Sequence, residues 1–326
     1  MSDISIVIPT FNRPERLLRV IEALLACDVS DIEKVEIIVV DDGSQPPAGY
    51  VIEGIKTQPP FGIRYIWQEN GGPAKARNRG FTEASYGVVL CLDDDIILDR
   101  EAIRRHLLAH ENNPGSVIFG QCLLDLSKDK SPSSNYIDSL QPKTEASDGL
   151  LRQEVIASGQ ISFEKKMFDG KGPYRTDLRT PAAEEYELSY RLKKMGVPVF
   201  MESGATGIHL ISGKVEDKCN QEYKYGIAIG ECFYKVPELM MFEPYRRIYE
   251  ANSPIDRKTD SVRRILKKTL KSVLAIRPVR TSLAVISRLL CDLRAPKFIL
   301  SRVLKTAFGI YLFAGVRDGL KKFRHS

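Results

Sequence analysis

Long apolar runs are missing from this 326-residue sequence. No stretch reaches the roughly 18 to 20 apolar residues that a membrane-spanning helix requires, and the amino terminus lacks the basic region and apolar segment of a signal peptide. We therefore expect a cytoplasmic protein. The hydrophobic content of 43% is enough for a substantial core, and the length predicts two domains or one large domain with an extension.

Cysteine is also scarce, and its spacing argues against two kinds of site. The six cysteines show neither CxxC nor CxH spacing, so neither a zinc site nor a disulfide framework is indicated. We expect reduced and mostly buried thiols. They are Cys27, Cys91, Cys122, Cys219, Cys232 and Cys291.

Acidic residues are rare in one part of the chain only. Residues 257–326 contain 18 Lys and Arg but only three acids, a local balance of about +15, which leaves about −9 for residues 1–256. The net charge of +6 therefore hides an acidic body and a basic tail.

The most informative stretch is the acidic triplet Asp93, Asp94 and Asp95, which interrupts the aliphatic run 88–98. Neighbouring carboxylates repel one another and are costly to desolvate, so they need a compensating cation, and hard oxygen ligands suit Mg²⁺ or Mn²⁺. In open α/β sheets, ligands bind just outside the carboxyl ends of the strands, which is where this triplet is expected. The alternative is a solvated acidic turn before the helix that starts near Arg100.

Strands and helices alternate over the first hundred residues. Short buried runs at 4–8, 35–40, 63–67 and 88–92 are separated by polar loops and by segments with helical spacing, such as 14–25 and 74–84. Continuous apolar strands that alternate with helices predict an α/β fold with a parallel sheet and helices on both faces. The polar segment 127–149 predicts a long mobile loop.

Four motifs together resemble the nucleotide-binding half of the family 2 glycosyltransferases, which have the GT-A fold. They are IVIPTFNR, IIVVDDGS, NGGPAKARNRG and LDDD, in this order over about 95 residues. The resemblance implies a mostly parallel, Rossmann-like sheet flanked by helices. We expect a nucleotide-sugar-binding half at 1–120, an acceptor-binding half at 121–256 and a basic helical extension at 257–326.

The resemblance also implies a donor site. Family members use a nucleotide-activated sugar, and the matching positions here are Pro9, Thr10, Asp41, Asp42, Arg77, Asn78, Asp93 and Asp94. Asp42 is a candidate acceptor for an imide N–H, which favours a uridine diphosphate sugar. The alternative for Arg77 is an ordinary surface arginine on a helix.

A divalent cation, Mn²⁺ or Mg²⁺, is implied by the same resemblance. Asp93 and Asp95 project to the same side of an extended segment, and Asp95 is the first candidate metal ligand. His209 matches a position where the family often has a histidine that reaches the metal or the diphosphate. The alternative for His209 is a structural role.

The acceptor side is expected at the helix that begins near Glu184. The family has an acidic pair there, whose second acid is the general base, so Glu185 is the candidate base and Glu184 the alternative. This sequence has Glu where the family motif has Asp, and the longer side chain changes the distance to the acceptor. Acids at the amino end of a helix also interact favourably with the helix dipole. The structural alternative is therefore that these glutamates only stabilise the helix.

We therefore predict an inverting glycosyltransferase that uses a nucleoside-diphosphate sugar and a hydroxyl acceptor, in a growing cell-surface or lipid-linked glycan. Two alternatives remain open. The altered Glu-Glu-x-Glu motif is compatible with a scaffold that binds the nucleotide sugar without turnover. A nucleotidyltransferase is a third class, but Pro9 to Arg13 lacks the glycine-rich basic loop it would need.

The basic tail predicts a further partner. Cations recur among aliphatic residues from Val262 to Leu274, and apolar segments follow at 282–293 and 298–315, too short and too charged to span a bilayer. We predict peripheral attachment to the cytoplasmic face of an anionic membrane. The alternative is a helical subdomain packed on the catalytic body. Nucleic-acid binding is not expected, because the cations alternate with aliphatic side chains rather than stacking aromatic ones.

Overall fold

The computed structural model describes residues 2–126, 131–139, 149–156, 159–210 and 213–324. The chain forms two compact units that are interleaved in sequence. The first contains residues 1–125, 141–177 and 188–211, and the second contains residues 126–140, 178–187 and 212–326. The predicted segments 1–120, 121–256 and 257–326 are contiguous, so their boundaries differ from those of the units.

The first unit is built on a nine-stranded sheet with the order β3-β2-β1-β4-β8-β6-β9-β5, in which β7 pairs with β9. The strands are β1 Ile4–Thr10, β2 Val35–Asp41, β3 Phe61–Trp67, β4 Val88–Leu92, β5 Ile96–Leu98, β6 Val117–Leu124, β7 Leu150–Gln153, β8 Gln160–Glu164 and β9 Val199–His209. The strands β3, β2, β1 and β4 pair in parallel, as predicted. Beyond β4 the sheet is mixed, because β8 is antiparallel to both β4 and β6.

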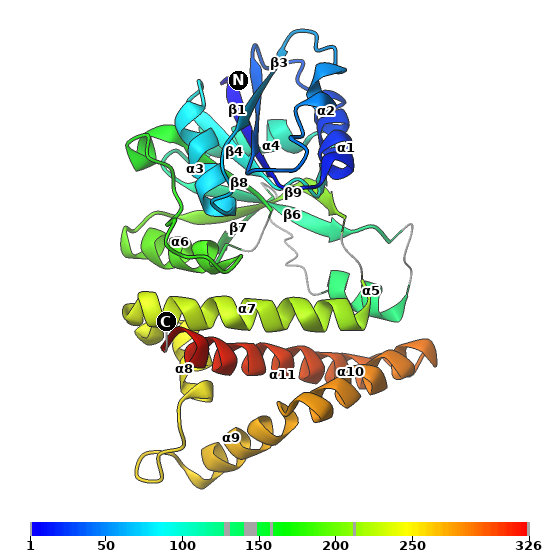
Figure 1. The fold of residues 1–326 in the computed structure, drawn as a ribbon, viewed down its shortest axis with the longest axis vertical. Coiled ribbons are helices and arrows are strands. Elements are labelled where there is room, and N and C mark those ends of the chain that lie inside the picture. Colours follow the sequence, from blue (N-terminus) through cyan, green and yellow to red (C-terminus); the bar gives the residue numbers. More distant parts are fainter. Residues whose placement is uncertain (1, 127–130, 140–148, 157–158, 211–212, 325–326) are drawn as a thin grey trace. The chain divides into compact units, whose positions relative to one another are not determined.

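Helices cover both faces of the parallel strands, with α1 on one side and α3 on the other (Figure 1). The helices of this unit are α1 Pro14–Leu25, α2 Tyr50–Glu53, α3 Pro73–Glu83, α4 Ala102–Asn112 and the later part of α6 Ala183–Lys194, with a 3₁₀ turn at Lys165–Phe168. Along β2, Ile37 and Val39 pack on the face of α1, whereas Ile38 and Val40 pack on the face of α3. Burial on both faces is why these strands are continuously apolar.

A buried polar network lies between α4 and β8. The Ser162 hydroxyl is 2.8 Å from Nδ1 of His106 and 2.8 Å from Nε2 of His110, and the Gln160 Oε1 is 3.2 Å from His106 Nε2. Gln160 also donates to the carbonyl of Ala205 on β9 at 3.0 Å. Burial lowers the pKa of both histidines to about 4, so the network holds neutral imidazoles at physiological pH.

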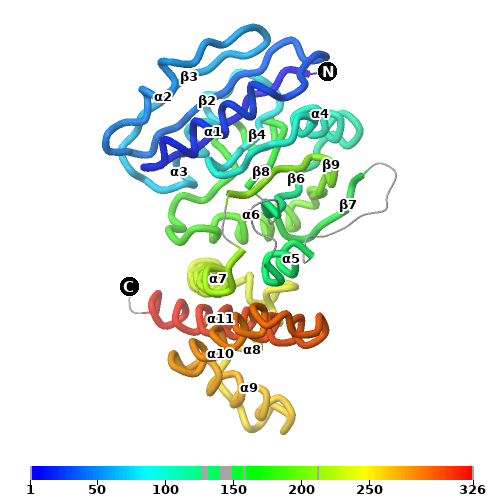
Figure 2. The backbone as a smooth tube through the Cα atoms, turned by 90° about the vertical axis from the view of Figure 1, so that its right-hand side faces the viewer, coloured from blue at the N-terminus to red at the C-terminus, as the bar shows by residue number. Residues whose placement is uncertain are grey.

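The second unit is helical. It contains α5 Pro132–Ser139, the first turn of α6, α7 Val215–Lys235, a 3₁₀ turn at Pro237–Met241, α8 Tyr245–Asn252, α9 Val262–Leu274, α10 Arg277–Asp292 and α11 Lys297–Arg324. In this unit α11 lies beside α7, and α9 lies on the side of α11 away from α7 (Figures 1 and 2). The helix α5 corrects the prediction that 127–149 is a loop. The rest of that segment, 127–130 and 140–148, lies outside the described residues.

Two pairs of glycines let α7 and α11 approach closely. A Cβ added to Gly230 would lie 2.8 Å from the carbonyl carbon of Gly319, and one added to Gly319 would lie 2.7 Å from the Ile227 carbonyl oxygen. A Cβ on Gly226 or Gly315 would likewise overlap the backbone of the opposite helix. Gly226 and Gly230 therefore do not interrupt α7, which is continuous and uses these positions for packing.

The helix α11 is longer than predicted. It has 28 residues, and by length and composition it is the one helix among those described that could cross a membrane. Of its most apolar 18-residue window, 56% is buried inside the structure. The prediction that no segment is long and apolar enough to span a membrane is therefore wrong for this helix. Arg302 and Lys305 lie at exposed positions on this continuous helix.

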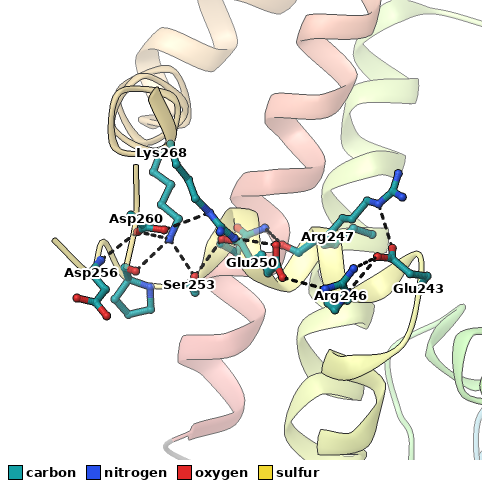
Figure 3. Close-up of polar contacts among 12 residues, drawn as sticks. Glu243, Arg246, Arg247, Glu250, Ser253, Asp256, Asp260 and Lys268 are labelled. Atoms are coloured by element: carbon teal, nitrogen blue, oxygen red, sulfur yellow. Dashed lines mark hydrogen bonds and ion pairs between the residues drawn. The ribbon is translucent and has the colours of Figure 1, made fainter. Parts of the chain in front are cut away.

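Ion pairs fix the start of α9 to α8 (Figure 3). Arg264 pairs with Glu250 at 2.7 Å and with Asp260 at 3.1 Å. The Lys268 ammonium is buried, lies 2.8 Å from the Asp260 carboxylate and donates to the Ser253 hydroxyl at 3.1 Å. Because a buried charge is stable only when paired, these contacts determine which face of α9 points inward.

The first prediction concerns acid stability. Because the folded-state pKa of His106 and His110 is about 4 and the ordinary value is 6.5, the unfolded state binds more protons between these values. We expect the melting temperature to fall as the pH is lowered from 6.5 towards 4. The slope should be smaller in His110→Gln, which removes one titrating group. Parallel slopes in the two proteins, measured by circular dichroism, would contradict this account.

The second prediction concerns the glycine contact. Gly315→Ala should lower the melting temperature, because the added methyl group meets the backbone of α7. Gly309→Ala, on the same helix, has open space around the added Cβ. It should raise stability by roughly 0.5 to 1 kcal/mol, as alanine is the better helix former. Equal effects of the two substitutions in thermal unfolding would show that α7 and α11 are not held in close contact.

Candidate functional site

The carboxyl ends of β1, β2 and β4 gather polar side chains at one edge of the sheet of the first unit. In the parallel register, Thr10 at the end of β1 is level with Asp41 at the end of β2. The acidic triplet follows β4, which pairs with β1 on its other side. The sheet thereby brings together segments that are more than 80 residues apart in sequence.

Asp94 is the buried member of the triplet. It accepts a hydrogen bond from the Thr10 hydroxyl at 2.8 Å and pairs with Arg13 at 3.1 Å. Burial raises the pKa of Asp94, and the Thr10 hydrogen bond and the Arg13 charge oppose that rise. Asp94 therefore joins the loop after β1 to the triplet.

Asp95 lies nearer the surface and next to His209. Its Oδ1 is 3.4 Å from His209 Nε2, and its Oδ2 is 3.3 Å from Arg16 and 3.6 Å from Arg13. Pairing of β5 with β9 places Ile96 opposite His209, which explains why the histidine meets the adjacent aspartate. Burial acts to raise the pKa of Asp95, but the His209 hydrogen bond and the two arginines outweigh it and lower the pKa. Asp95 is thus an ionised carboxylate at neutral pH.

Asp93 pairs with the buried guanidinium of Arg77. Their closest atoms are 2.6 Å apart, and Arg77 lies over the Tyr174 ring with its Cζ 5.4 Å from the ring centroid. The backbone N–H of Asp93 donates to the Gly159 carbonyl at 2.7 Å. The structure thus excludes the alternative of an ordinary surface arginine for Arg77, because only 7% of the residue is exposed.

Asp41 and Asp42 organise the loops beside the triplet. The Asp41 carboxylate accepts from the backbone N–H groups of Ser44 and Ala48 at 2.8 and 2.7 Å, and from the Tyr65 hydroxyl at 2.6 Å. Asp42 instead holds the turn before α3, by accepting from the backbone N–H groups of Gly71 and Gly72 at 2.9 and 2.8 Å. Both side chains are buried and pre-organise the loop backbone.

The remaining predicted donor residues lie in the same unit but do not all meet the triplet. Pro9 is within β1, paired with Val40. Asn78 is directed to another loop: its amide donates to the Tyr174 carbonyl at 2.6 Å and accepts from the Tyr174 N–H at 3.0 Å. In this arrangement Asn78 fixes the segment that carries the ring beneath Arg77.

Glu184 and Glu185 belong to the second unit, in the first turn of α6. Glu184 is buried and Glu185 is half-buried. The chain before this turn is held by Glu231 of α7, which accepts from the backbone N–H groups of Arg179 at 3.0 Å and Thr180 at 2.8 Å. Ala182 has a left-handed backbone, with φ of 74°. These contacts set the direction in which α6 begins.

Sequence reasoning missed Arg13 and Arg16. Both guanidiniums reach the triplet, although half of each side chain remains accessible, with 50% and 42% exposed. The signal was available in the loop PTFNRPER, because Pro14 starts α1 and places two arginines three residues apart at its amino end. These cations provide charge beside Asp94 and Asp95 that the motif match alone did not identify.

The side chains at this edge of the sheet include two that could bind a divalent cation. No cluster of three or more His, Cys, Asp or Glu side chains suited to a metal occurs in the described part of the chain. Asp95 and His209 offer one hard oxygen and one imidazole nitrogen 3.4 Å apart. Mg²⁺ and similar ions are commonly held by one or two protein ligands together with substrate phosphates and water. The two side chains therefore fit a cation that is shared with a diphosphate.

Comparison with known proteins identifies the family of this chain. An α/β sheet with acidic and basic side chains at its carboxyl edge is typical of an enzyme that binds a charged ligand there. The family described as "Glycosyl transferase family 2" matches residues 5–168, which is half of the chain. The protein is an enzyme that belongs to glycosyltransferase family 2, and the expected family resemblance is confirmed.

Curated relatives include synthases of polysaccharides. The poly-β-1,6-N-acetyl-D-glucosamine synthase of Staphylococcus aureus is 36% identical over 213 residues, covering 62% of this chain and 48% of the relative. Validoxylamine A glucosyltransferase of Streptomyces hygroscopicus subsp. jinggangensis is 27% identical over 233 residues, covering 63% and 54%. The chain spans about half the length of these curated relatives.

Solved structures confirm the GT-A fold. The mannosyltransferase PcManGT of Pyrobaculum calidifontis, solved with GDP-Man and Mn²⁺, has a TM-score of 0.63 at 14% identity and covers 98% of this chain and 87% of its own. GalNAc-T7, solved with UDP, GalNAc and Mn²⁺, has a TM-score of 0.53 at 15% identity, over 77% and 50%. At these identities the similarity shows the fold alone.

Proposed function

We propose that this protein transfers a sugar from a nucleoside-diphosphate sugar, with a uridine nucleotide favoured, to a hydroxyl group of a glycan acceptor. The observation that carries the proposal is the ionised Asp95 beside His209 and two arginines, at the edge of the sheet where α/β folds bind ligands. The polysaccharide synthase among the relatives supports a growing glycan as acceptor. The solved neighbours that hold nucleotides and Mn²⁺ support the donor class and a divalent ion.

Four side chains would bind the donor diphosphate. When bound, a divalent cation at Asp95 and His209 would neutralise charge that develops on the leaving diphosphate. Arg13 and Arg16 are accessible enough to turn towards phosphate oxygens without leaving the site. Asp94 keeps the loop after β1 attached through Thr10, so the arginines are presented in a defined place.

The acceptor would be activated by a carboxylate at the start of α6. Glu185 takes the proton from the acceptor hydroxyl as that oxygen attacks the anomeric carbon, and the bond to the nucleoside diphosphate breaks on the opposite side, which inverts the configuration. Glu184 is the alternative base, although its burial leaves it less accessible than Glu185. The longer glutamate side chain, in place of the family's aspartate, sets the reach of either residue.

We also propose that the reaction takes place at the cytoplasmic face of a membrane, where a lipid-linked or extruded glycan is accessible. The support is the concentration of positive charge in residues 257–326, with 18 Lys and Arg against three acids. Peripheral attachment brings the enzyme to such an acceptor.

The third prediction tests the metal and donor site. Asp95→Ala should abolish Mn²⁺-dependent binding of a uridine diphosphate sugar, because it removes the ionised ligand, and should leave the melting temperature of the free protein nearly unchanged. Asp31→Ala, which removes an exposed carboxylate paired with Arg104, is the matched control. Isothermal titration calorimetry with and without Mn²⁺ measures donor binding by both variants. Retention of metal-dependent binding in Asp95→Ala would refute the assignment.

The fourth prediction tests the base. Glu185→Gln keeps the size and hydrogen bonding of the side chain, so the donor should bind normally while transfer falls by roughly 10² to 10⁴. The measurement is single-turnover release of nucleoside diphosphate with a matched acceptor. Glu184→Gln is the paired variant, and a loss there instead would move the role to Glu184.

The same assay separates the other function classes. Pyrophosphate release would indicate a nucleotidyltransferase. Donor binding without turnover by the wild-type protein, across a panel of acceptors, would indicate a scaffold.

A further inference from the structure

Two cations of α9, Arg264 and Lys268, are paired on the side of the helix that faces the rest of its unit. Lys268 is 6% exposed, and its ammonium is bound by the Asp260 carboxylate, the Ser253 hydroxyl and the Pro254 carbonyl at 2.8, 3.1 and 3.2 Å (Figure 3). Arg264, one turn earlier on the same side, is bound by Glu250 and Asp260. The ion pairs therefore fix the rotation of the helix about its own axis.

The opposite face of α9 is aliphatic and exposed. Positions i, i+4, i+8 and i+11 of a helix fall on one side, and here they are Val262, Leu266, Leu270 and Val273. Their exposed fractions are 74%, 65%, 59% and 49%. A helix in water is stabilised by the reverse arrangement, with aliphatic side chains buried and lysines solvated. The orientation of α9 therefore indicates an apolar environment on its outer side.

A second exposed apolar stripe continues on the next helix. Ile286, Leu289 and Leu293, at the carboxyl end of α10, are 50%, 48% and 77% exposed, and Phe298 at the start of α11 is 66% exposed. The helix α9 leads directly into α10 (Figure 1). Together these residues form a larger exposed apolar surface than the scattered apolar side chains of an ordinary protein surface.

The charges beside the aliphatic row are of one sign. Residues 261–291 contain eight Lys and Arg and no Asp or Glu. Arg263, Lys267 and Arg277 are exposed, and none pairs with an acid in the described part of the chain. Cations that border an exposed aliphatic face are the pattern of a helix that lies in the headgroup region of an anionic bilayer.

We propose that α9, with the carboxyl end of α10, lies flat in the interface of an anionic membrane and inserts Val262, Leu266, Leu270 and Val273 between the lipids. The glycine face of α11 is not part of this contact, because Gly315 and Gly319 pack against α7. The proposal rests on the proposed function only for the location of the acceptor, since lipid binding itself requires no sugar transfer.

The test uses the full-length protein and vesicles of phosphatidylglycerol with phosphatidylcholine, or of phosphatidylcholine alone. Wild type should co-sediment with the anionic vesicles at low salt, and less at high salt. Leu266→Ser with Leu270→Ser should lose binding at every salt concentration, and Arg263→Glu with Lys267→Glu should weaken it by about tenfold or more. Met195→Ser with Met241→Ser, which also removes two exposed apolar side chains, should bind like wild type.

Insertion can be observed directly with a tryptophan. The sequence has one tryptophan, Trp67 in β3. Leu270→Trp in a Trp67→Phe background should shift its fluorescence emission to shorter wavelength when anionic vesicles are added. No shift, despite binding, would overturn insertion of the aliphatic row.

Three further outcomes would overturn the proposal. They are absence of wild-type binding to anionic vesicles at low salt, unchanged binding by the Leu266/Leu270 variant, and a dimer without vesicles that this variant converts to monomer. The last would assign the face to a second copy of the chain. Donor binding and sugar transfer to a soluble acceptor, measured without vesicles, should be unchanged in the Leu266/Leu270 variant, so failure of the lipid proposal is distinguishable from failure of the proposed function.

Discussion

The neutralisation of three consecutive carboxylates by arginines is the constraint on which the site depends. Unpaired, Asp93, Asp94 and Asp95 would repel one another at the end of a buried strand. Arg77 from α3 and Arg13 from the loop after β1 contact the first two, and Arg16 from α1 helps to neutralise the third. Because these cations come from different segments, the ion pairs that lower the electrostatic cost also hold the donor loops in place around β4.

The two units use burial in opposite ways. In the first unit, apolar side chains alternate between two covered faces of a sheet, and the buried polar groups such as the Ser162 network are hydrogen-bonded. In the second unit, α7 and α11 pack through glycine, while α9 places paired cations inside and aliphatic side chains outside. The first arrangement buries its apolar side chains on both faces of the sheet, and the second leaves an exposed apolar surface, which the proposed contact with lipid would cover.

Several residues have a local structural role that also supports the site. Asp41 and Asp42 are bound to loop N–H groups, and Asn78 is bound to the backbone of Tyr174. Such contacts reduce the freedom of the loops before any ligand is bound, which lowers the entropic cost of binding. A match to a family motif identifies these positions without distinguishing a residue that touches the donor from one that shapes the loop around it.

The sequence by itself determined the α/β class, the parallel strands β1 to β4, the family and the acidic triplet, because these follow from local apolar runs and short contiguous motifs. It also gave α9 almost to the residue. Tertiary structure decided the rest: the mixed far half of the sheet, the pairing of Asp95 with His209, the roles of Arg13 and Arg16, and the packing function of Gly226 and Gly230. Each of these depends on contacts between segments distant in sequence. The outward face of α9 is the clearest case, since helical periodicity defines two faces, and the tertiary contacts of Arg264, Lys268 and Leu274 decide which of them is buried.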